Sequence, residues 1–453
     1  MRKVYGKFIC LAVGVAAVVL CSRPVLSQET EKSILTLDKA VSIALRQNRD
    51  ILISDQDRYK ADAQIAEARS GAFPQLTASA QYMRNVELPV IFLPANTPPF
   101  NPTSSTISFA IGSNNSYQGG LTLTQALYSR QVGVALDIAN TYKDMSNAGY
   151  ESVRQSVVLQ VKKAFYAVLL MQKLVEATRQ GLDVVKANYQ NVKSLYDHGQ
   201  AAEFDLLRAE VQVANTEPSL ISSENNLVLA VNGLKSLLSI PLDSNVVIQG
   251  SFSYTEVPQA VLDEGGNEAL TSNPSLQQLE LQESMLHKNI SVESSGYFPS
   301  LYAFGSYQWQ SQDNTFQFGN YLWAKIVNVG VTLSWNIFDG LRTPARVEEA
   351  RVELRKVQYT RLKAEEGITI QVQSARLKMD EANRRIQGQE KNIQQAKRAV
   401  SIAETRFKNG VGTQLELLDA QVAMTLAQTN YAQAIYDYLV AKADWDYAVG
   451  RIR

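Results

Sequence analysis

The chain has 453 residues, enough for two or three domains of ordinary size. Lysine and arginine together number 44, as do aspartate and glutamate, so the formal net charge is zero and gives no reason to expect a nucleic-acid partner. Charged residues make up 19% of the chain, below the usual share of about a quarter, which indicates surfaces that are polar but uncharged.

The first 27 residues have the three parts of a secretory signal. Three basic residues precede an apolar stretch at 8–20, and a small-residue cleavage site follows at 25–27. Both cysteines, Cys10 and Cys21, lie inside this segment, so the mature protein is expected to contain no thiol and no disulfide. Lipidation at Cys21 is the alternative, although the leucine before it is not the small residue that a lipoprotein signal requires.

After this signal, no apolar run approaches the roughly 18–20 residues that a membrane-spanning helix needs. The longest, residues 164–171, has lysine and glutamine close on both sides. The exported protein is therefore expected either to be soluble or to cross a membrane as strands.

The next segments predict a short helix and two strands joined by a long loop. The helix covers about 50–72, and apolar residues alternate along the first strand, 73–83. A second alternating strand, about 121–128, leads to the next helix. The segment between the strands, 84–116, contains five prolines and predicts an exposed external loop without a buried face.

A very long helix is predicted over residues 130–197. The span has no proline, and apolar residues at 182–196 recur at steps of three and four, as in a heptad seam. At 1.5 Å per residue this helix is about 100 Å long, and such a length requires lateral packing against partners. A turn at Gly199 and a return helix over 202–240 follow, in which Pro218 predicts a kink.

Several motifs of the first half return in the second. Gly296-Tyr-Phe298-Pro299 matches Gly71-Ala-Phe73-Pro74 at a shift of 225 positions, and Asn273 matches Asn48 at the same shift. The glycine turn at Gly199 returns 211 positions later, at Gly410. A period this long predicts that one large unit of helices and strands was duplicated.

The duplication divides the mature chain into a first repeat, 28–240, a linker, 241–268, and a second repeat, 269–453. The elements expected in the second repeat are a helix at 275–297, strands at 298–310 and 329–337, a long helix at 344–407 and a return helix at 413–449.

The expected helix lengths are complementary. In each repeat the short helix and the return helix together match the long helix to within one or two turns. We therefore expect them to stack end to end beside it, so that each repeat supplies two columns of a helical wall about 100 Å tall. A free-standing coiled-coil rod is the alternative, but the strands at one end of the helices argue against it.

The strands have lengths, aromatic ends and alternating faces that suit an outer-membrane barrel, although a soluble sandwich shows the same alternation. One chain supplies four strands, whereas a spanning barrel needs at least about eight and tolerates no open edge in lipid. The barrel would therefore be shared among identical chains. Two, three or four copies are compatible with the residues, and three would give about twelve strands around a water-filled lumen.

The combined motifs resemble those of the TolC-like outer-membrane efflux protein family, over essentially the whole mature chain. The motifs that carry the likeness are the two Gly-x-Phe-Pro sequences, the junction Trp335-Asn-Ile-Phe338-Asp339-Gly340-Leu-Arg342, and the hairpins Gly199…Asp205-Leu-Leu207 and Gly410…Glu416-Leu-Leu418-Asp419. The resemblance implies an α+β, mostly helical fold. Its members are trimers, in which a twelve-stranded transmembrane β-barrel continues into a long periplasmic α-helical coiled-coil barrel, and the linker 241–268 would lie around the middle of that tube.

The same resemblance implies an outer-membrane channel of a tripartite efflux system in a Gram-negative-type bacterium. Such a channel contacts outer-membrane lipid and passively exports small molecules, which a periplasmic adaptor protein and an inner-membrane pump deliver to it. A duct for secreted polypeptides is the main alternative. A periplasmic adaptor is a weaker one, because an adaptor carries one helical hairpin and this chain has two. The cargo is not specified, because the lumen of the family is generic.

Four charged residues beside the hairpin turns are candidate gate or selectivity residues. Glu416 and Asp419 lie three positions apart on one face of a helix, and they align with the acidic ring that many family members place at their closed mouth. Thr413 and Glu416 also fit a capping box, which is a purely structural explanation of Glu416. The equivalent residues in the first repeat are Asp205 and Arg208, which we expect to form inter-helix pairs.

The turn glycines, Gly199 and Gly410, are expected to adopt left-handed backbone conformations and to mark the tips that an adaptor contacts. No pattern predicts catalysis. The histidines of the mature chain, His198 and His287, belong to no metal-site or catalytic-triad pattern, and no glycine-rich phosphate loop is present. The sequence therefore predicts a protein that is no enzyme and holds no metal or cofactor.

Overall fold

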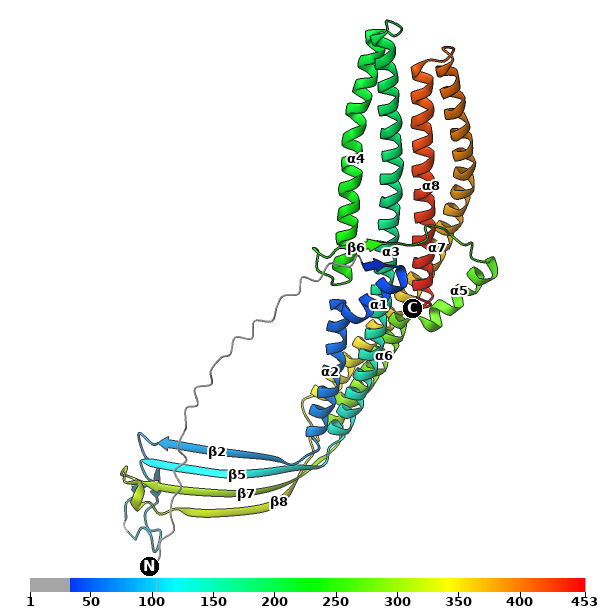
Figure 1. The fold of residues 1–453 in the computed structure, drawn as a ribbon. Coiled ribbons are helices and arrows are strands. Elements are labelled where there is room, and N and C mark those ends of the chain that lie inside the picture. The colour runs from blue at the N-terminus through cyan, green and yellow to red at the C-terminus, as the bar shows by residue number, and fades with distance from the viewer. Residues whose placement is uncertain (1–32, 103, 453) are drawn as a thin grey trace, which may run out of the picture.

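The computed structural model describes residues 33–102 and 104–452. The signal expected at 1–27 and the lipidation site considered at Cys21 lie outside these residues. Figure 1 shows a sheet at one end of the molecule and a tall layer of helices that rises from it. No helix in the described part of the chain combines the length and the apolarity of a transmembrane span.

Each half of the chain contains the same order of elements. In the first half these are α2 (Arg49–Ser70), β2 (Gln75–Arg84), β5 (Asn115–Tyr128), α3 (Arg130–Asp197) and α4 (Glu203–Leu237). In the second half they are α6 (Pro274–Glu293), β7 (Ser300–Asp313), β8 (Ala324–Ser334), α7 (Arg342–Lys408) and α8 (Gln414–Ala448). A short 3₁₀ turn, η1 (Ser294–Tyr297), joins α6 to β7, and another, η2 (Phe318–Asn320), precedes β8. The expected main elements are thus confirmed, with the helices close to their expected bounds, whereas β5 and β8 begin six and five residues earlier than expected.

The loop expected at 84–116 is only partly irregular. It contains a small antiparallel hairpin of β3 (Val90–Leu93) and β4 (Ile107–Ala110), in which Val90 pairs with Ala110 and Leu93 with Ile107. The sequence did not predict these two strands, but the segment is exposed as expected, since seven of the eight strand residues are exposed. Each strand is a run of only four residues, and the prolines that separate the two runs dominate the sequence pattern.

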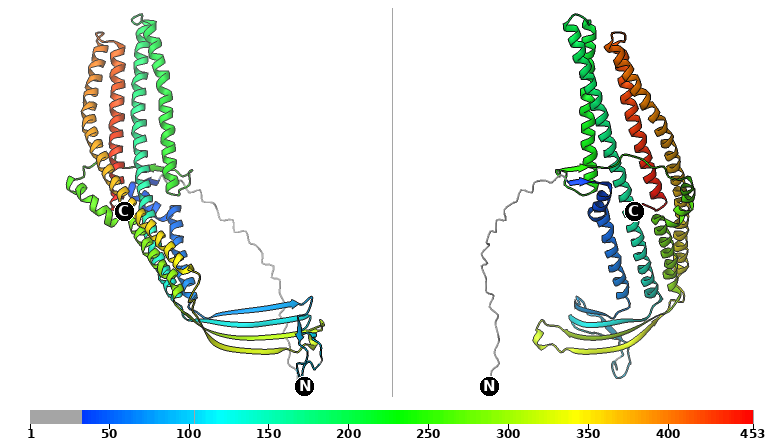
Figure 2. Two further views of the ribbon diagram at one scale, coloured as in Figure 1. Left: turned by 180° about the vertical axis from the view of Figure 1, so that it is seen from behind. Right: turned by 45° about the vertical axis from the view of Figure 1, so that its right-hand side comes forward.

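The long helix α3 occupies the centre of the helical layer. Helices α2 and α4 pack along one side of α3, α6 and α8 pack along its other side, and α7 packs beyond α6 and α8 (Figures 1 and 2). The two shorter helices of each half therefore do form one column beside a long helix, as their lengths predicted.

One asparagine joins the two shorter helices in each column. The Asn48 side-chain oxygen caps α2 by accepting from Asp50 N at 2.9 Å, and its Nδ2 donates to Leu237 O at the end of α4, at 2.8 Å. Asn273 repeats the arrangement in the second half, where Oδ1 accepts from Ser275 N at 2.9 Å and Nδ2 donates to Ala448 O at 3.2 Å. Both asparagines are buried. Each asparagine accepts from a backbone N–H at the start of one helix and donates to a carbonyl oxygen at the end of another. These backbone groups would otherwise lack a hydrogen-bond partner.

A second layer covers the middle of the helices. It consists of a parallel pair of β1 (Ser33–Leu35) and β6 (Val246–Ile248), followed by α1 (Leu37–Gln47) and α5 (Gln259–Ser272), with the segment 249–258 as a strap between β6 and α5. The strap is fixed to α8 by the Tyr438 hydroxyl, which accepts from Val257 N and donates to Thr255 O, both at 3.0 Å. The expected linker, 241–268, therefore contains β6, the strap and most of α5.

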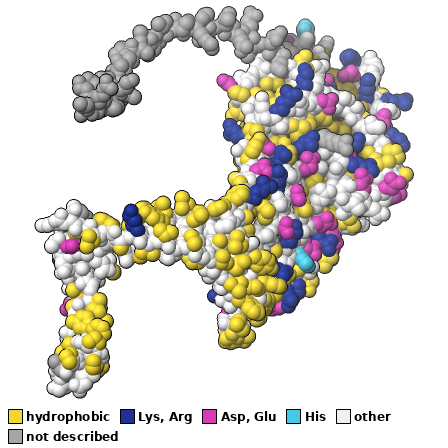
Figure 3. Space-filling view, turned by 90° about the horizontal axis from the view of Figure 1, so that it is seen from below, with side chains coloured by type: hydrophobic (Ala, Val, Ile, Leu, Met, Phe, Trp, Pro, Cys, Tyr) yellow, Lys and Arg dark blue, Asp and Glu magenta, His cyan; other side chains and the backbone are white. Residues whose placement is uncertain are grey.

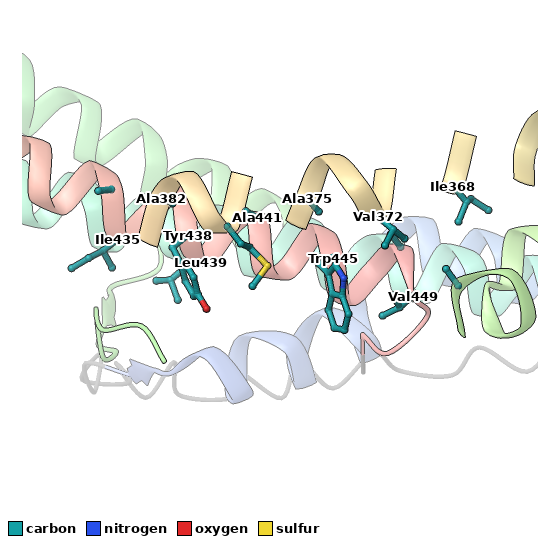
Figure 4. Packing of buried hydrophobic residues seen from close by; sticks show 14 of the residues in the cluster. Ile368, Val372, Ala375, Ala382, Ile435, Tyr438, Leu439, Ala441, Trp445 and Val449 are labelled. Atoms are coloured by element: carbon teal, nitrogen blue, oxygen red, sulfur yellow. The ribbon is translucent and has the colours of Figure 1, made fainter. Parts of the chain in front are cut away.

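The largest apolar core lies beneath this layer, between α7 and α8. Figure 4 shows Ile368, Val372, Ala375 and Ala382 of α7 facing Ile435, Tyr438, Ala441 and Trp445 of α8. Trp445 is 2% exposed, and a Cβ on Gly265 of α5 would stand 2.6 Å from its ring. The core thus anchors α5 as well as the two long columns.

We expect Asn273→Ala to lower the free energy of unfolding by about 1–3 kcal/mol, because it removes the α6 cap and leaves Ala448 O without its donor. Asn273→Asp retains the accepting oxygen, so its free energy of unfolding should lie between those of Asn273→Ala and the parent protein. The measurement is helix melting of the purified protein in detergent, with the exposed α5 residue changed in Asn267→Ala as the control. An Asn273→Ala variant that melts like the parent would contradict the joining role.

Candidate functional site

The sheet has one apolar and one polar face. Its strands are all antiparallel in the order β2-β5-β7-β8, so residues paired in register lie on the same face. The apolar face carries Leu76, Ala78, Ala80, Leu121, Leu123, Tyr307, Trp309, Val327, Val329, Val331 and Leu333, with one lysine, Lys325, at the start of β8. The opposite face is mainly polar and carries Gln75, Thr77, Ser79, Gln81, Thr122, Thr124, Ser306, Gln308, Gln310, Asn328 and Thr332, together with Tyr302, Phe304 and Ile326.

The apolar face is solvent-exposed in the single chain. Val329 is 84% exposed, and Leu76 and Leu333 are each 67% exposed. Figure 3 shows hydrophobic side chains gathered along the arm of the molecule that the sheet forms. An apolar surface of this extent indicates contact with lipid or with another protein, since soluble monomers rarely expose one.

Aromatic side chains gather where the sheet ends away from the helices. The rings of Tyr82 and Tyr117 stack with centroids 5.0 Å apart, and Tyr321 lies 5.3 Å from Tyr117. Phe316 adjoins Tyr82 at 6.5 Å, and the Arg84 guanidinium lies 5.7 Å from the Phe316 centroid. Tyr82 and Tyr117 belong to the apolar face, so they form an aromatic rim at one border of it. Such a rim is typical of the border between lipid and water.

Both outer strands of the sheet lack a neighbour on one side. Strand β2 is exposed along its whole length, and β8 is exposed at all but two positions. The chain leaves the helices along β2 and returns to them along β8 (Figure 1), so the two edges run in opposite directions. The free N–H and C=O groups of β8 in one copy could therefore form an antiparallel ladder with those of β2 in a neighbouring copy.

The far ends of the long helices form two hairpin tips. Gly199 and Gly410 have φ values of +71° and +72°, which confirms the expected left-handed turns. Gln200 N donates to Leu195 O at 2.7 Å, and Val411 N donates to Arg406 O at 3.0 Å, so the last carbonyls of α3 and α7 are satisfied.

The second tip holds its two candidate acids in different surroundings. The Thr413 hydroxyl caps α8 by accepting from Glu416 N at 3.2 Å. The Glu416 carboxylate does not complete the capping box, because its Oε2 accepts from Arg406 Nε at 3.2 Å. Asp419 is exposed, and its carboxylate makes no ion pair or hydrogen bond with any residue that the structure describes. Of the two, Asp419 is thus the acid whose charge is not already compensated.

The first tip is built differently. The residue before α4 is Ala202, whose side chain provides no cap. Asp205 and Arg208 are half-buried, and neither forms an ion pair within the described part of the chain. The inter-helix pairs expected for them are therefore not formed within one chain.

The seam between the two hairpins contains unsatisfied polar groups. The amides of Gln414 and Gln421 in α8 and of Asn188 in α3 each place at least one buried atom without a hydrogen-bond partner in the described chain. Leaving such groups unpaired costs about 1–3 kcal/mol each, so this seam is less stable than an apolar one would be.

A cavity of about 490 Å³ lies at mid-height between α1, α3 and α8. It is lined by the charged residues Asp38, Arg46, Lys162, Lys442 and Asp446, beside apolar ones such as Leu439. Burial lowers the pKa of Lys162 and raises the pKa values of Asp446 and Tyr166. Within the described ranges, no cluster of His, Cys, Asp and Glu has the arrangement of a metal site.

Sequence reasoning missed three features of these sites. The partner of Glu416 lies ten residues upstream across a turn, and no local pattern indicates that pairing. The cavity joins α1 to helices more than a hundred residues away. The sequence shows that Asn48 and Asn273 occupy equivalent positions in the two repeats. Their joining role could not be predicted, because it depends on where the ends of α4 and α8 lie in the fold.

Comparison with known proteins gives a consistent result. The sequence model of the outer membrane efflux protein family matches residues 40–239 and 266–451. Outer membrane protein TolC of Vibrio cholerae is 24% identical over 394 residues, which cover 86% of this chain and 87% of TolC. The alkaline protease secretion protein AprF of Pseudomonas aeruginosa is 22% identical over 340 residues, which cover 74% of this chain and 70% of AprF.

Solved structures share the fold. The CmeC outer membrane channel of Campylobacter jejuni superposes with a TM-score of 0.69 at 20% identity, over 91% of this chain and 85% of CmeC. At this identity the likeness concerns the fold, namely a four-stranded sheet joined to long paired helices.

The two tips provide a matched test of capping. We expect Thr413→Ala to speed amide hydrogen exchange in the first turn of α8 by roughly fivefold, since a lost cap costs about 1 kcal/mol. Ala202→Thr supplies the missing hydroxyl to α4 and should slow exchange in its first turn. Mass spectrometry of peptides from both tips measures the two effects. If the first-turn amides of α4 and α8 exchanged at equal rates in the parent protein, the hydroxyl of Thr413 would not stabilise its helix start as proposed.

Proposed function

Because this chain belongs to the outer membrane efflux protein family, we propose that three copies form one channel across the outer membrane. The protein is an outer-membrane efflux channel of a Gram-negative-type bacterium, and the family is one of channel proteins. In the proposed assembly, three four-stranded sheets close into a twelve-stranded barrel and the helices continue it as a tube through the periplasm.

The observation that carries this proposal is the sheet with two free edges and two different faces. A four-stranded sheet leaves backbone groups unpaired at β2 and β8, and lipid offers no hydrogen bonds to satisfy them. Pairing β8 of one copy with β2 of the next satisfies both edges. The apolar face then meets lipid, and the polar, uncharged face lines a water-filled lumen.

The helical layer supports the same assembly. Glu217 and Glu224 of α4 pair with Lys186 and Arg179 of α3, so they mark the side of α4 that meets α3. Phe204, Val211 and Leu229 follow one another at whole numbers of turns on another side of α4 and are 70%, 57% and 66% exposed. At the opposite edge of the layer, Tyr359, Ile370 and Leu377 of α7 are at least 62% exposed. In the proposed trimer these apolar edges pack against each other.

We also propose that the chain arose by duplication of one unit. The same order of a helix, two strands, a long helix and a return helix occurs twice, and Asn48 and Asn273 make the same junction in both halves. The repeats would be 28–240 and 269–453, with 241–268 as the linker around the middle of the tube.

The channel is passive in this proposal, and its partners supply energy and cargo. The tips at Gly199 and Gly410 would contact a periplasmic adaptor, which connects them to an inner-membrane pump. Small molecules are the proposed cargo. A duct for secreted polypeptides is the second candidate, favoured by the similarity to AprF, a protein named for alkaline protease secretion.

The periplasmic tips would form the gate. Threefold symmetry gathers three copies of Asp419 and Glu416, and the uncompensated charge of Asp419 supports its role in attracting cations and narrowing the mouth. Asp205 and Arg208 would form pairs between neighbouring copies. The unsatisfied amides of Gln414 and Gln421 support a seam that opens at modest cost.

The assembly is tested by the mass of the protein extracted from outer membranes in mild detergent. We expect a trimer for the parent and dissociation to monomers for the double variant Val211→Glu/Leu229→Glu, which places six like charges in the proposed contacts. Asn267→Glu, an exposed charge on α5, is the control. A monomeric parent, or a double variant as stably trimeric as the parent, would remove the proposed packing of the helical wall.

The gate is tested in planar bilayers. We expect Asp419→Ala to raise single-channel conductance and to reduce cation selectivity, because it removes three uncompensated charges from the mouth. Glu416→Ala should change conductance less, since Arg406 already compensates Glu416. Asp243→Ala, exposed at mid-height, serves as the charge control. Unchanged conductance and selectivity in Asp419→Ala would exclude the acidic ring.

A further inference from the structure

The β3–β4 hairpin exposes apolar side chains on both faces. Ile91, Leu93, Ile107 and Phe109 share one face, and Val90 and Phe92 lie on the other. Phe92 is 65% exposed, and Ile91 and Phe109 are 46% and 44% exposed. The two strands contact each other, but neither packs extensively against any other described helix or strand. An isolated two-stranded hairpin is marginally stable in water, so this one is expected to have a partner in the assembled protein.

The hairpin is a built structure and is not a loose loop. At its base, Asn85 N donates to Asn114 O at 2.8 Å and Asn85 Nδ2 donates to Ser113 O at 2.9 Å. At its far end, Asn101 is fully buried, and its Nδ2 lies 2.9 Å from the carbonyl oxygens of Leu93, Pro94 and Ser105. Polar side chains thus hold both ends, and they fix the orientation of the apolar strands between them.

The base of the hairpin adjoins the polar face of the sheet. A Cβ on Gly112, just after β4, would stand 3.9 Å from Oε1 of Gln312, and Gln312 pairs with Ser116 on the polar face. Figure 3 shows the hairpin projecting to one side from the far end of the sheet. The other loop of the sheet behaves differently, because its Phe316 and Tyr321 pack on the aromatic rim of the apolar face.

The composition of the hairpin selects among possible partners. Residues 85–114 contain a single charged residue, Glu87, and no lysine or arginine. The segment therefore has no cation to attract an anionic lipid headgroup. Its base lies on the side that would face the aqueous lumen, and it continues directly from β2, the strand proposed to meet the neighbouring copy. Threefold symmetry would place the three copies of this hairpin around one axis at the outer mouth, where each presents the same exposed apolar side chains to the others.

We propose that the β3–β4 hairpins of neighbouring copies pack against each other across the outer mouth of the channel and close it with an apolar constriction. The proposal rests on the trimeric channel proposed above. An apolar constriction excludes water and ions when narrow, so the outer mouth would be sealed by dewetting while the tips are sealed by charge. Cargo would open it by separating the three hairpins, whose contacts involve no ion pair.

Single cysteines test the contact directly, in a background that lacks Cys10 and Cys21, the two cysteines of the chain. We expect Phe92→Cys to give mainly cross-linked dimers and trimers with a short bis-maleimide in outer membranes. The matched control is Leu322→Cys, which is 90% exposed in the other external loop and should be labelled by a single maleimide without cross-linking. Phe92→Cys that is labelled efficiently but never cross-linked in a trimer would overturn the proposal.

The outcome is separable from a failure of the trimer itself. If the unlinked protein is monomeric in mild detergent, the proposed assembly fails; if it is trimeric and the hairpins do not cross-link, only the constriction fails. A second variant, Phe92→Ser/Phe109→Ser, should remain trimeric, lose its apolar contact and raise single-channel conductance in planar bilayers. A trimeric double variant with the conductance of the parent would also refute the constriction.

Discussion

The requirement that every backbone N–H and C=O group in lipid be hydrogen-bonded governs this architecture. Four strands leave two free edges, and nothing else in the described chain covers them. The constraint also explains the faces of the sheet, since a closed ring of strands separates lipid from water only when side chains alternate between apolar and polar. In the proposed assembly, the single chain is one segment of a wall that identical neighbours close.

The helical part meets a different constraint. A column about 100 Å tall must stay continuous where one helix ends and another begins. Asn48 and Asn273 solve this by capping the lower helix and donating to the last turn of the upper one. The mid-height layer of α1, β1, β6 and α5 covers these junctions, with Tyr438 fixing the strap to α8. The wall is thus reinforced where its columns are interrupted.

Sequence patterns predicted the long helices, because these depend on a periodicity that is local and extends over many turns. Helix α3 has the bounds that the sequence indicated, and α7 extends the prediction by two residues at its start and one at its end. Features that depend on distant partners were missed. The strands β1 and β6 are three residues each and pair across two hundred positions, and the β3–β4 hairpin consists of two four-residue runs separated by prolines. At the tips, Glu416 was expected to complete a capping box, but the Arg406 guanidinium competes successfully for its carboxylate.

The distribution of charge along the proposed channel separates its two ends. The polar face of the sheet carries mainly amides and hydroxyls, which in the proposed lumen would not select a passing molecule by its charge. Ionised groups that are not compensated stand at the periplasmic tips, where Asp419 projects. The outer end has the opposite character, with one charged residue between Asn85 and Asn114 and an apolar hairpin. In the proposed channel the tips would be closed by charge and the outer mouth by apolar contact, so that ions would meet a barrier at both ends.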